Sequence, residues 1–135
     1  MIMLIRRKIA STVAAGFMAL GGGIIAAGPA HAASSAFGCQ PGFVCVYADS
    51  TIGSLQNGNI IARFERYGAN NLDNVNGNHW VVNNQTGGSN ATAVMCYNYW
   101  GGNCTGTVVN VQPNGWNTAV VVDMTPINSI WLNRP

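Results

Sequence analysis

The feature that most constrains the fold of this chain is an internal repeat: residues 44–83 recur, loosely but in register, fifty positions later. The clearest matches are V-x-x-Y, which begins at Val44 and Val94, and N-x-x-x-(V/L)-N, which begins at Asn78 and Asn128. Self-similarity at one period indicates a structural unit used twice, and two copies are too few for a solenoid, which needs about three or more. We therefore predict two halves that share one core and carry function on loops that differ.

A secretory signal peptide is predicted over residues 1–32. A basic start at residues 6–8 precedes an apolar stretch of small residues, and Ala30-His31-Ala32 fits the pattern at which such leaders are cleaved. A transmembrane anchor is the alternative, but this stretch contains several glycines and ends at Pro29, whereas a spanning helix needs about twenty mostly apolar residues. We expect a secreted, extracellular domain over residues 33–135.

The charge of this mature chain differs from that of the whole sequence. Three arginines remain against four carboxylates, so the formal charge is −1 rather than the +2 of the full chain. No basic patch is left to neutralise phosphates, and nucleic-acid binding is therefore not expected. A chain of this length forms one small domain with a modest core. We expect a monomer without membrane contact after cleavage.

All four cysteines lie in the mature part, and an even count in a short exported chain indicates disulfides with three possible connectivities. Proximity in the sequence favours Cys39–Cys45 and Cys96–Cys104, each contributing roughly 2–3 kcal/mol to stability. The repeat aligns Cys45 with Met95. Because side chains alternate along a strand, Cys45 and Cys96 should then point to opposite faces of equivalent strands.

The mature sequence predicts an all-β fold with about four strands in each half. Asparagine and glycine clusters, typical of turns, separate short runs of valine and aromatic residues, and no ten-residue stretch keeps a helical period. Asn57-Gly58 is a strong turn signal between two strands, and residues 70–78 form a long turn-rich stretch. The expected strands are residues 43–48, 59–64, 79–83, 92–97, 107–111, 118–122 and 129–132.

Three segments carry a family resemblance. Residues 39–47, CQPGFVCVY, resemble the opening of a family of secreted actinobacterial peptidase inhibitors that includes the streptomycete metalloproteinase inhibitors. Residues 99–106 resemble its second-half segment, in which a cysteine lies in a glycine-rich turn, and residues 126–130 resemble its closing stretch. The resemblance implies a βγ-crystallin-like sandwich of two four-stranded Greek-key motifs, at about residues 39–85 and 90–135.

No metal or cofactor is expected. The calcium signature of βγ-crystallins ends in serines, and Asn78-His79 and Asn128-Ser129 stand in their places. Calcium needs six to eight oxygen ligands, usually including carboxylates, and the four mature carboxylates are scattered. A zinc site is disfavoured because the cysteine spacings are wider than the usual pair and only one histidine remains in the mature chain.

No convincing catalytic set is present, and we expect a protein that is not an enzyme. His79 is the only mature histidine and stands in a predicted strand, where a structural role is more common. Asp73 and Asp123 occupy equivalent repeat positions, which suits turn capping better than glycosidase chemistry. Cys104 could act as a nucleophile only if it were unpaired.

The segment between Cys96 and Cys104 is the predicted binding site. A disulfide would close it into a constrained loop, and a peptidase-inhibiting loop is expected to present an extended backbone that is already ordered. Tyrosine and tryptophan supply large rigid contact areas and are enriched in binding hot spots. The candidate residues are Tyr97, Asn98, Tyr99, Trp100, Gly101, Gly102 and Asn103, with Trp116 extending the same surface.

The predicted function is inhibition of an extracellular peptidase, and the resemblance implies a metallopeptidase. The alternative is a non-enzymatic antimicrobial or glycan-binding module that contacts cell-wall material. Surfaces rich in aromatic and amide side chains suit sugars as well as proteins, so the composition leaves both open.

Overall fold

A computed structural model describes residues 34–111 and 118–135 of the chain, so the expected signal peptide and Trp116 lie outside the described part. Within it the chain forms eight strands, one short α-helix and one 3₁₀ turn. The elements of the first half are β1 (Phe43–Tyr47), α1 (Ile52–Gln56), β2 (Ile60–Phe64), β3 (Gly68–Asn71) and β4 (Asn78–Asn84). Those of the second half are β5 (Ala93–Cys96), η1 (Tyr99–Gly101), β6 (Val108–Val109), β7 (Thr118–Asp123) and β8 (Ser129–Leu132).

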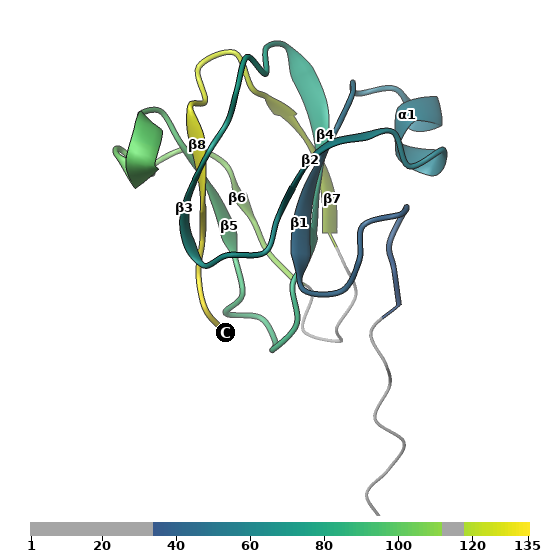
Figure 1. The fold of residues 1–135 in the computed structure, drawn as a ribbon, viewed down its shortest axis with the longest axis horizontal. Helices are drawn as coiled ribbons and strands as arrows, with labels where there is room; N and C mark the ends of the chain where they lie inside the picture. The colour runs from purple at the N-terminus through teal and green to yellow at the C-terminus, as the bar shows by residue number, and fades with distance from the viewer. Residues whose placement is uncertain (1–33, 112–117) are drawn as a thin grey trace, which may run out of the picture. The chain divides into compact units, whose positions relative to one another are not determined.

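The strands form two four-stranded sheets, with the orders β2-β1-β4-β7 and β3-β8-β5-β6 (Figure 1). All neighbouring strands are antiparallel. The third strand of each half lies in the sheet built mainly by the other half: β3 pairs with β8, and β7 pairs with β4. The all-β prediction is therefore confirmed, and the exchange of strands joins the two halves.

The main core lies between the two sheets. Val46 and Val81 from the first sheet and Met95 and Ile130 from the second belong to one cluster of buried side chains. Each Å² of apolar surface removed from water stabilises the folded state by about 25 cal/mol, so the burial of this cluster holds the two sheets together. The core residues alternate with outward-facing residues along each strand, as expected for a sheet with one buried face.

The two halves repeat with a shift of 49 residues in their central strands, not 50. Val46 pairs with Val81, Met95 pairs with Ile130, and all four side chains face the core. Val46 therefore corresponds to Met95 and Val81 to Ile130, each 49 residues apart. A one-residue change of register moves every side chain to the other face of a strand. The sequence alignment found the repeat but was offset by one residue, so it assigned the side chains of these strands to the wrong face of the sheet.

This register corrects the predicted orientation of the cysteines. The counterpart of Cys45 is Val94, and Cys96 follows two positions later on the same face. Both cysteines therefore point away from the core, whereas the sequence alignment placed them on opposite faces. The disulfides join Cys39 to Cys45 and Cys96 to Cys104, the pairs favoured by sequence proximity. Each attaches a loop to the outer face of its sheet.

Residues 34–42, called the N-terminal segment below, cover the outer face of the first sheet. Ala36 and Cys39 are buried there against Cys45 and Val82 in a second apolar cluster. Tyr47 lies beneath the segment, and its hydroxyl donates a hydrogen bond to the carbonyl oxygen of residue 37 at 2.9 Å. Burial raises the pKa of Tyr47 to about 12, although Arg63 opposes the shift.

Two local predictions were wrong. Asn57-Gly58 is not a hairpin turn; it ends helix α1. Gly58 has a φ of +66°, its N–H donates to the carbonyl of Leu55, and the N–H of Asn59 donates to the carbonyl of Ser54. These bonds are those of a Schellman motif, which favours glycine at the position after the C-cap.

Strand β3 was also not expected, because its sequence GANN lies partly in the predicted turn-rich stretch. Glycine and asparagine have low β-propensity, so nothing local favours a strand here. β3 forms because β8 supplies its backbone partners, with Ala69 opposite Trp131. No helix in the described residues is long and apolar enough to cross a membrane.

Candidate functional site: the disulfide-closed aromatic loop

The predicted binding segment, residues 96–104, forms a compact loop between β5 and β6. The Cys96–Cys104 disulfide closes its base. Inside the loop, the N–H of Tyr97 donates to the carbonyl of Asn103 at 3.1 Å, and the N–H of Asn98 donates to the carbonyl of Gly102 at 3.1 Å. The loop therefore has its own hydrogen-bonded frame in addition to the disulfide.

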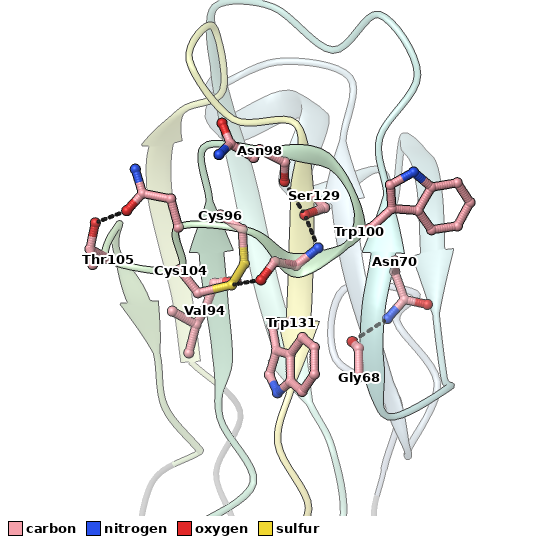
Figure 2. The surroundings of a disulfide bond; sticks show 12 residues. Gly68, Asn70, Val94, Cys96, Asn98, Trp100, Cys104, Thr105, Ser129 and Trp131 are labelled. Atoms are coloured by element: carbon pink, nitrogen blue, oxygen red, sulfur yellow. Dashed lines mark hydrogen bonds between the residues drawn. A yellow bond between two sulfur atoms is a disulfide. The ribbon is translucent and has the colours of Figure 1, made fainter.

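Three side chains from other strands and loops attach this loop to the second sheet. The Ser129 hydroxyl donates to the carbonyl of Asn98 at 2.7 Å and accepts from the N–H of Gly101 at 3.1 Å (Figure 2). The amide of Asn128 donates to the carbonyl of Tyr97 at 2.6 Å, and Asn71 Oδ1 accepts from the N–H of Trp100 at 2.8 Å. These bonds occupy backbone groups on both sides of the loop tip.

Gly101 brings the tip into close contact with the sheet. Its φ is +75°, which side chains disfavour, and a Cβ atom at this position would lie 2.4 Å from Cε3 of Trp131 and 3.2 Å from Cβ of Ala69. Only glycine fits without a shift of the tryptophan ring. The tryptophan in turn is oriented by a 3.0 Å hydrogen bond from its Nε1 to Asn133 Oδ1.

The aromatic side chains of the tip point outward. Trp100 is 80% exposed, and Tyr97 and Tyr99 are also exposed. Figure 2 shows the Trp100 indole directed away from the loop backbone. Tyr97 is thus a surface residue, in contrast to Tyr47, which is fully buried in the first half.

The conformation of the tip differs from the extended backbone expected of a substrate-like loop. Tyr99–Gly101 form a 3₁₀ turn, and Trp100 has φ 60° and ψ 27°, in the left-handed region. Asn103 also has a positive φ, of 51°. A left-handed conformation costs a residue with a side chain about 1–2 kcal/mol. The hydrogen bonds that the N–H groups of Trp100 and Gly101 donate to Asn71 and Ser129 offset this cost. Because these acceptors are distant in sequence, the local sequence could not reveal the conformation.

The structure brings together all seven loop residues predicted from the sequence, and Trp116 lies outside the described residues. The sequence prediction missed the residues that hold the loop: Asn71, Asn128, Ser129 and Trp131. Asn128 begins the repeated closing motif, and this was the only signal that could have pointed to it. Asn71 gave no signal, because it lies in the strand that the sequence did not predict.

The other candidate residues have structural environments. Nδ1 of His79 lies 2.7 Å from the carbonyl oxygen of Tyr47, and Nε2 lies 2.8 Å from that of Asn76, so both ring nitrogens make backbone contacts. Asp123 caps a turn, and the backbone N–H of Thr125 holds the pKa of its carboxyl below the usual value. The described residues contain no group of three or more histidine, cysteine, aspartate or glutamate side chains placed to hold a metal ion.

Comparison with known proteins adds no relative: none of the family models, curated proteins or solved structures matches the chain.

Proposed function

We propose that this protein is a secreted inhibitor of an extracellular peptidase, with metallopeptidases as the first target class, and that the 96–104 loop is its binding element. The scaffold would be a βγ-crystallin-like sandwich of two Greek-key motifs, a reading supported by the placement of β3 and β7 in each other's sheets. Two disulfides and the leader-like N-terminus support export.

One observation carries the proposal: the 80%-exposed Trp100 is held in a strained conformation by the hydrogen bond that its backbone N–H donates to Asn71 of β3. A monomer gains little by exposing its largest apolar side chain, and strained backbone that tertiary contacts maintain is concentrated at functional sites. Tryptophan and tyrosine are the commonest hot-spot residues in protein interfaces. The loop is also ordered before binding, which reduces the entropy cost of association.

The geometry favours recognition through side chains over a substrate-like backbone. The N–H groups of Trp100 and Gly101 already donate to Asn71 and Ser129, so they are not available to pair with an enzyme as an added strand. The left-handed turn at the tip also differs from the extended conformation in which peptidases bind substrates. Trp100 and Tyr99 would instead enter an apolar pocket of the target and block access to its active site.

The test uses the oxidised mature chain, residues 33–135, and thermolysin as a representative metallopeptidase. We expect the wild type to inhibit at stoichiometric ratio. In Trp100→Ala the inhibition constant should rise about 30-fold or more, because the loss of a hot-spot side chain costs about 2 kcal/mol of binding free energy. Mass spectrometry of the complex should find the loop uncleaved. The matched control is Ile52→Ala, which removes a 61%-exposed apolar side chain from α1 and should inhibit like the wild type.

Two outcomes would contradict the proposal. Failure to inhibit thermolysin and a panel of extracellular serine peptidases at stoichiometric ratio would remove the inhibitor function, and retention on chitin would then support the glycan-binding alternative. Inhibition that is unchanged in Trp100→Ala would remove the role of the loop while leaving the function in place.

A further inference from the structure

A second bulky aromatic residue shares the left-handed backbone conformation of Trp100. In the part of the chain that the structure describes, four residues other than glycine have a positive φ. Two of them are Asn74 and Asn103, whose short polar side chains tolerate this region. The other two are Trp100, with φ 60°, and Phe37, with φ 51°. A positive φ is an outlier for a bulky side chain, and Phe37 lies outside the 96–104 loop.

Phe37 lies at the tip of a two-residue hairpin formed by residues 36–39, called the Phe37 turn below. Ala36 and Cys39 exchange both of their backbone hydrogen bonds, at 2.8 and 2.7 Å. The two residues between them, Phe37 and Gly38, both have positive φ. Turns of this kind favour Asn-Gly. Glycine occupies the second position, whereas phenylalanine occupies the first against the local preference.

Tertiary contacts fix the backbone of the Phe37 turn. The Tyr47 hydroxyl donates to the carbonyl oxygen of Phe37 at 2.9 Å, and a Cβ atom at Gly58 would lie 3.1 Å from the same oxygen. Ala36 and Cys39 are buried against the first sheet, and the disulfide of Cys39 anchors the turn to β1. The turn is therefore ordered before any binding, which reduces the entropy cost of association.

The phenyl ring is the part of the turn that is available to a partner. It is 43% exposed, and the N-terminal segment around it contains no charged residue. The backbone groups of Ala36 and Cys39 pair with each other, and the carbonyl of Phe37 accepts from Tyr47, so the turn cannot pair with a partner as an added strand. The complement of this ring is an uncharged, apolar pocket, because a charged pocket would lose hydration without gaining a partner.

The Phe37 turn and the 96–104 loop lie on opposite faces of the sandwich. The turn packs on the outer face of the first sheet, and the loop is attached to the outer face of the second. In Figure 1 the loop, marked by η1, lies at the left of the two sheets, and the N-terminal segment lies with α1 at the right. A partner bound at Trp100 would therefore leave Phe37 accessible to another.

We propose that the Phe37 turn is a second binding element, which inserts its phenyl ring into the apolar specificity pocket of a serine peptidase. Chymotrypsin-type peptidases have such a pocket, a hydrophobic slot. The choice of a peptidase as the partner rests on the proposed function, whereas the assignment of Phe37 as a binding residue rests on the turn itself. The protein is then a two-headed inhibitor that holds a serine peptidase at one face and a metallopeptidase at the other.

The experiment compares Phe37→Asn with the wild type, using the oxidised mature chain, residues 33–135, and chymotrypsin. Asparagine suits the first position of the turn, so this variant removes the ring and keeps the backbone. We expect the inhibition constant for chymotrypsin to rise about tenfold or more, while that for thermolysin stays unchanged. The urea unfolding midpoint should not fall, because asparagine relieves the backbone strain. Trp100→Ala should weaken inhibition of thermolysin only.

The matched control is Ile61→Ala, which shortens a 52%-exposed side chain of β2 and should inhibit chymotrypsin like the wild type. Size-exclusion chromatography should find both enzymes in one complex with the wild type. The proposal is overturned if chymotrypsin is not inhibited, if Phe37→Asn inhibits it like the wild type, or if thermolysin displaces it. A lower unfolding midpoint of Phe37→Asn would also overturn it, because the ring would then serve packing. Inhibition of chymotrypsin that depends on Phe37, without inhibition of thermolysin, would support the turn and contradict the role of the 96–104 loop.

Discussion

The two disulfide-closed segments each contain a glycine with positive φ, and this allows a controlled test of the contact between the loop and Trp131. Gly101 lies between Cys96 and Cys104 with φ +75°, and Gly42 lies between Cys39 and Cys45 with φ +91°. A Cβ at Gly101 would overlap the Trp131 ring, whereas a Cβ at Gly42 would meet nothing within 4 Å. Replacement by alanine therefore adds the same backbone strain at both sites and a steric clash at only one.

The magnitudes follow from these two terms. A left-handed alanine costs about 1–2 kcal/mol, which is the whole effect expected for Gly42→Ala. Gly101→Ala adds about 1–3 kcal/mol for forcing an atom into a packed contact. If the ring moves outward instead, the hydrogen bond from Trp131 to Asn133 is lost, at about 1 kcal/mol. Gly101→Ala should therefore destabilise the protein by about 2–5 kcal/mol.

Urea unfolding of the oxidised protein, followed by far-ultraviolet circular dichroism, measures both values. With a denaturant dependence of about 1–2 kcal/mol per molar for a domain of this size, the unfolding midpoint of Gly101→Ala should lie about 1 M below that of Gly42→Ala. Equal midpoints would refute the tight contact between the tip and the sheet. The thermolysin assay gives a second readout, because only Gly101→Ala displaces the loop that carries Trp100.

Three further predictions concern hydrogen bonds that the structure assigns. Because an unfolded tyrosine ionises near pH 10 and folded Tyr47 keeps its proton to about pH 12, the free energy of unfolding should fall as the pH rises between these values. Tyr47→Phe removes the hydroxyl and should lower the free energy of unfolding by about 1 kcal/mol at neutral pH. Urea titrations at alkaline pH should show that this variant lacks the decline. The pKa of Asp123 is lowered by the N–H of Thr125, so its contribution is present above the unfolded pKa of about 3.9 and is lost as the pH falls further; Asp123→Asn should flatten the acid limb of the stability profile. Asn71→Ala removes the acceptor for the Trp100 N–H and should raise the inhibition constant about tenfold, while the unfolding midpoint stays close to that of the wild type. An unchanged inhibition constant would show that the loop tip does not need the hydrogen bond to Asn71.

Much of the fold was readable from the sequence because its causes are local. Alternating valine and aromatic runs between asparagine-glycine clusters specify strands whatever their partners, and seven of the eight observed strands lie at the predicted places. Cysteines six and eight residues apart pair with each other because little chain entropy is lost in closing such short loops. The seven residues of the candidate site follow from the same short-range closure.

Only the tertiary structure decided which side chains of the repeated strands face the core, the strand at residues 68–71 and the shape of the loop tip. Each depends on a partner distant in sequence: Val46 and Met95 face one core, β8 supplies the backbone partners of β3, and Asn71 holds Trp100 in a left-handed conformation that its side chain disfavours. Local preferences differ by about 1 kcal/mol per residue, so contacts made across the sandwich override them.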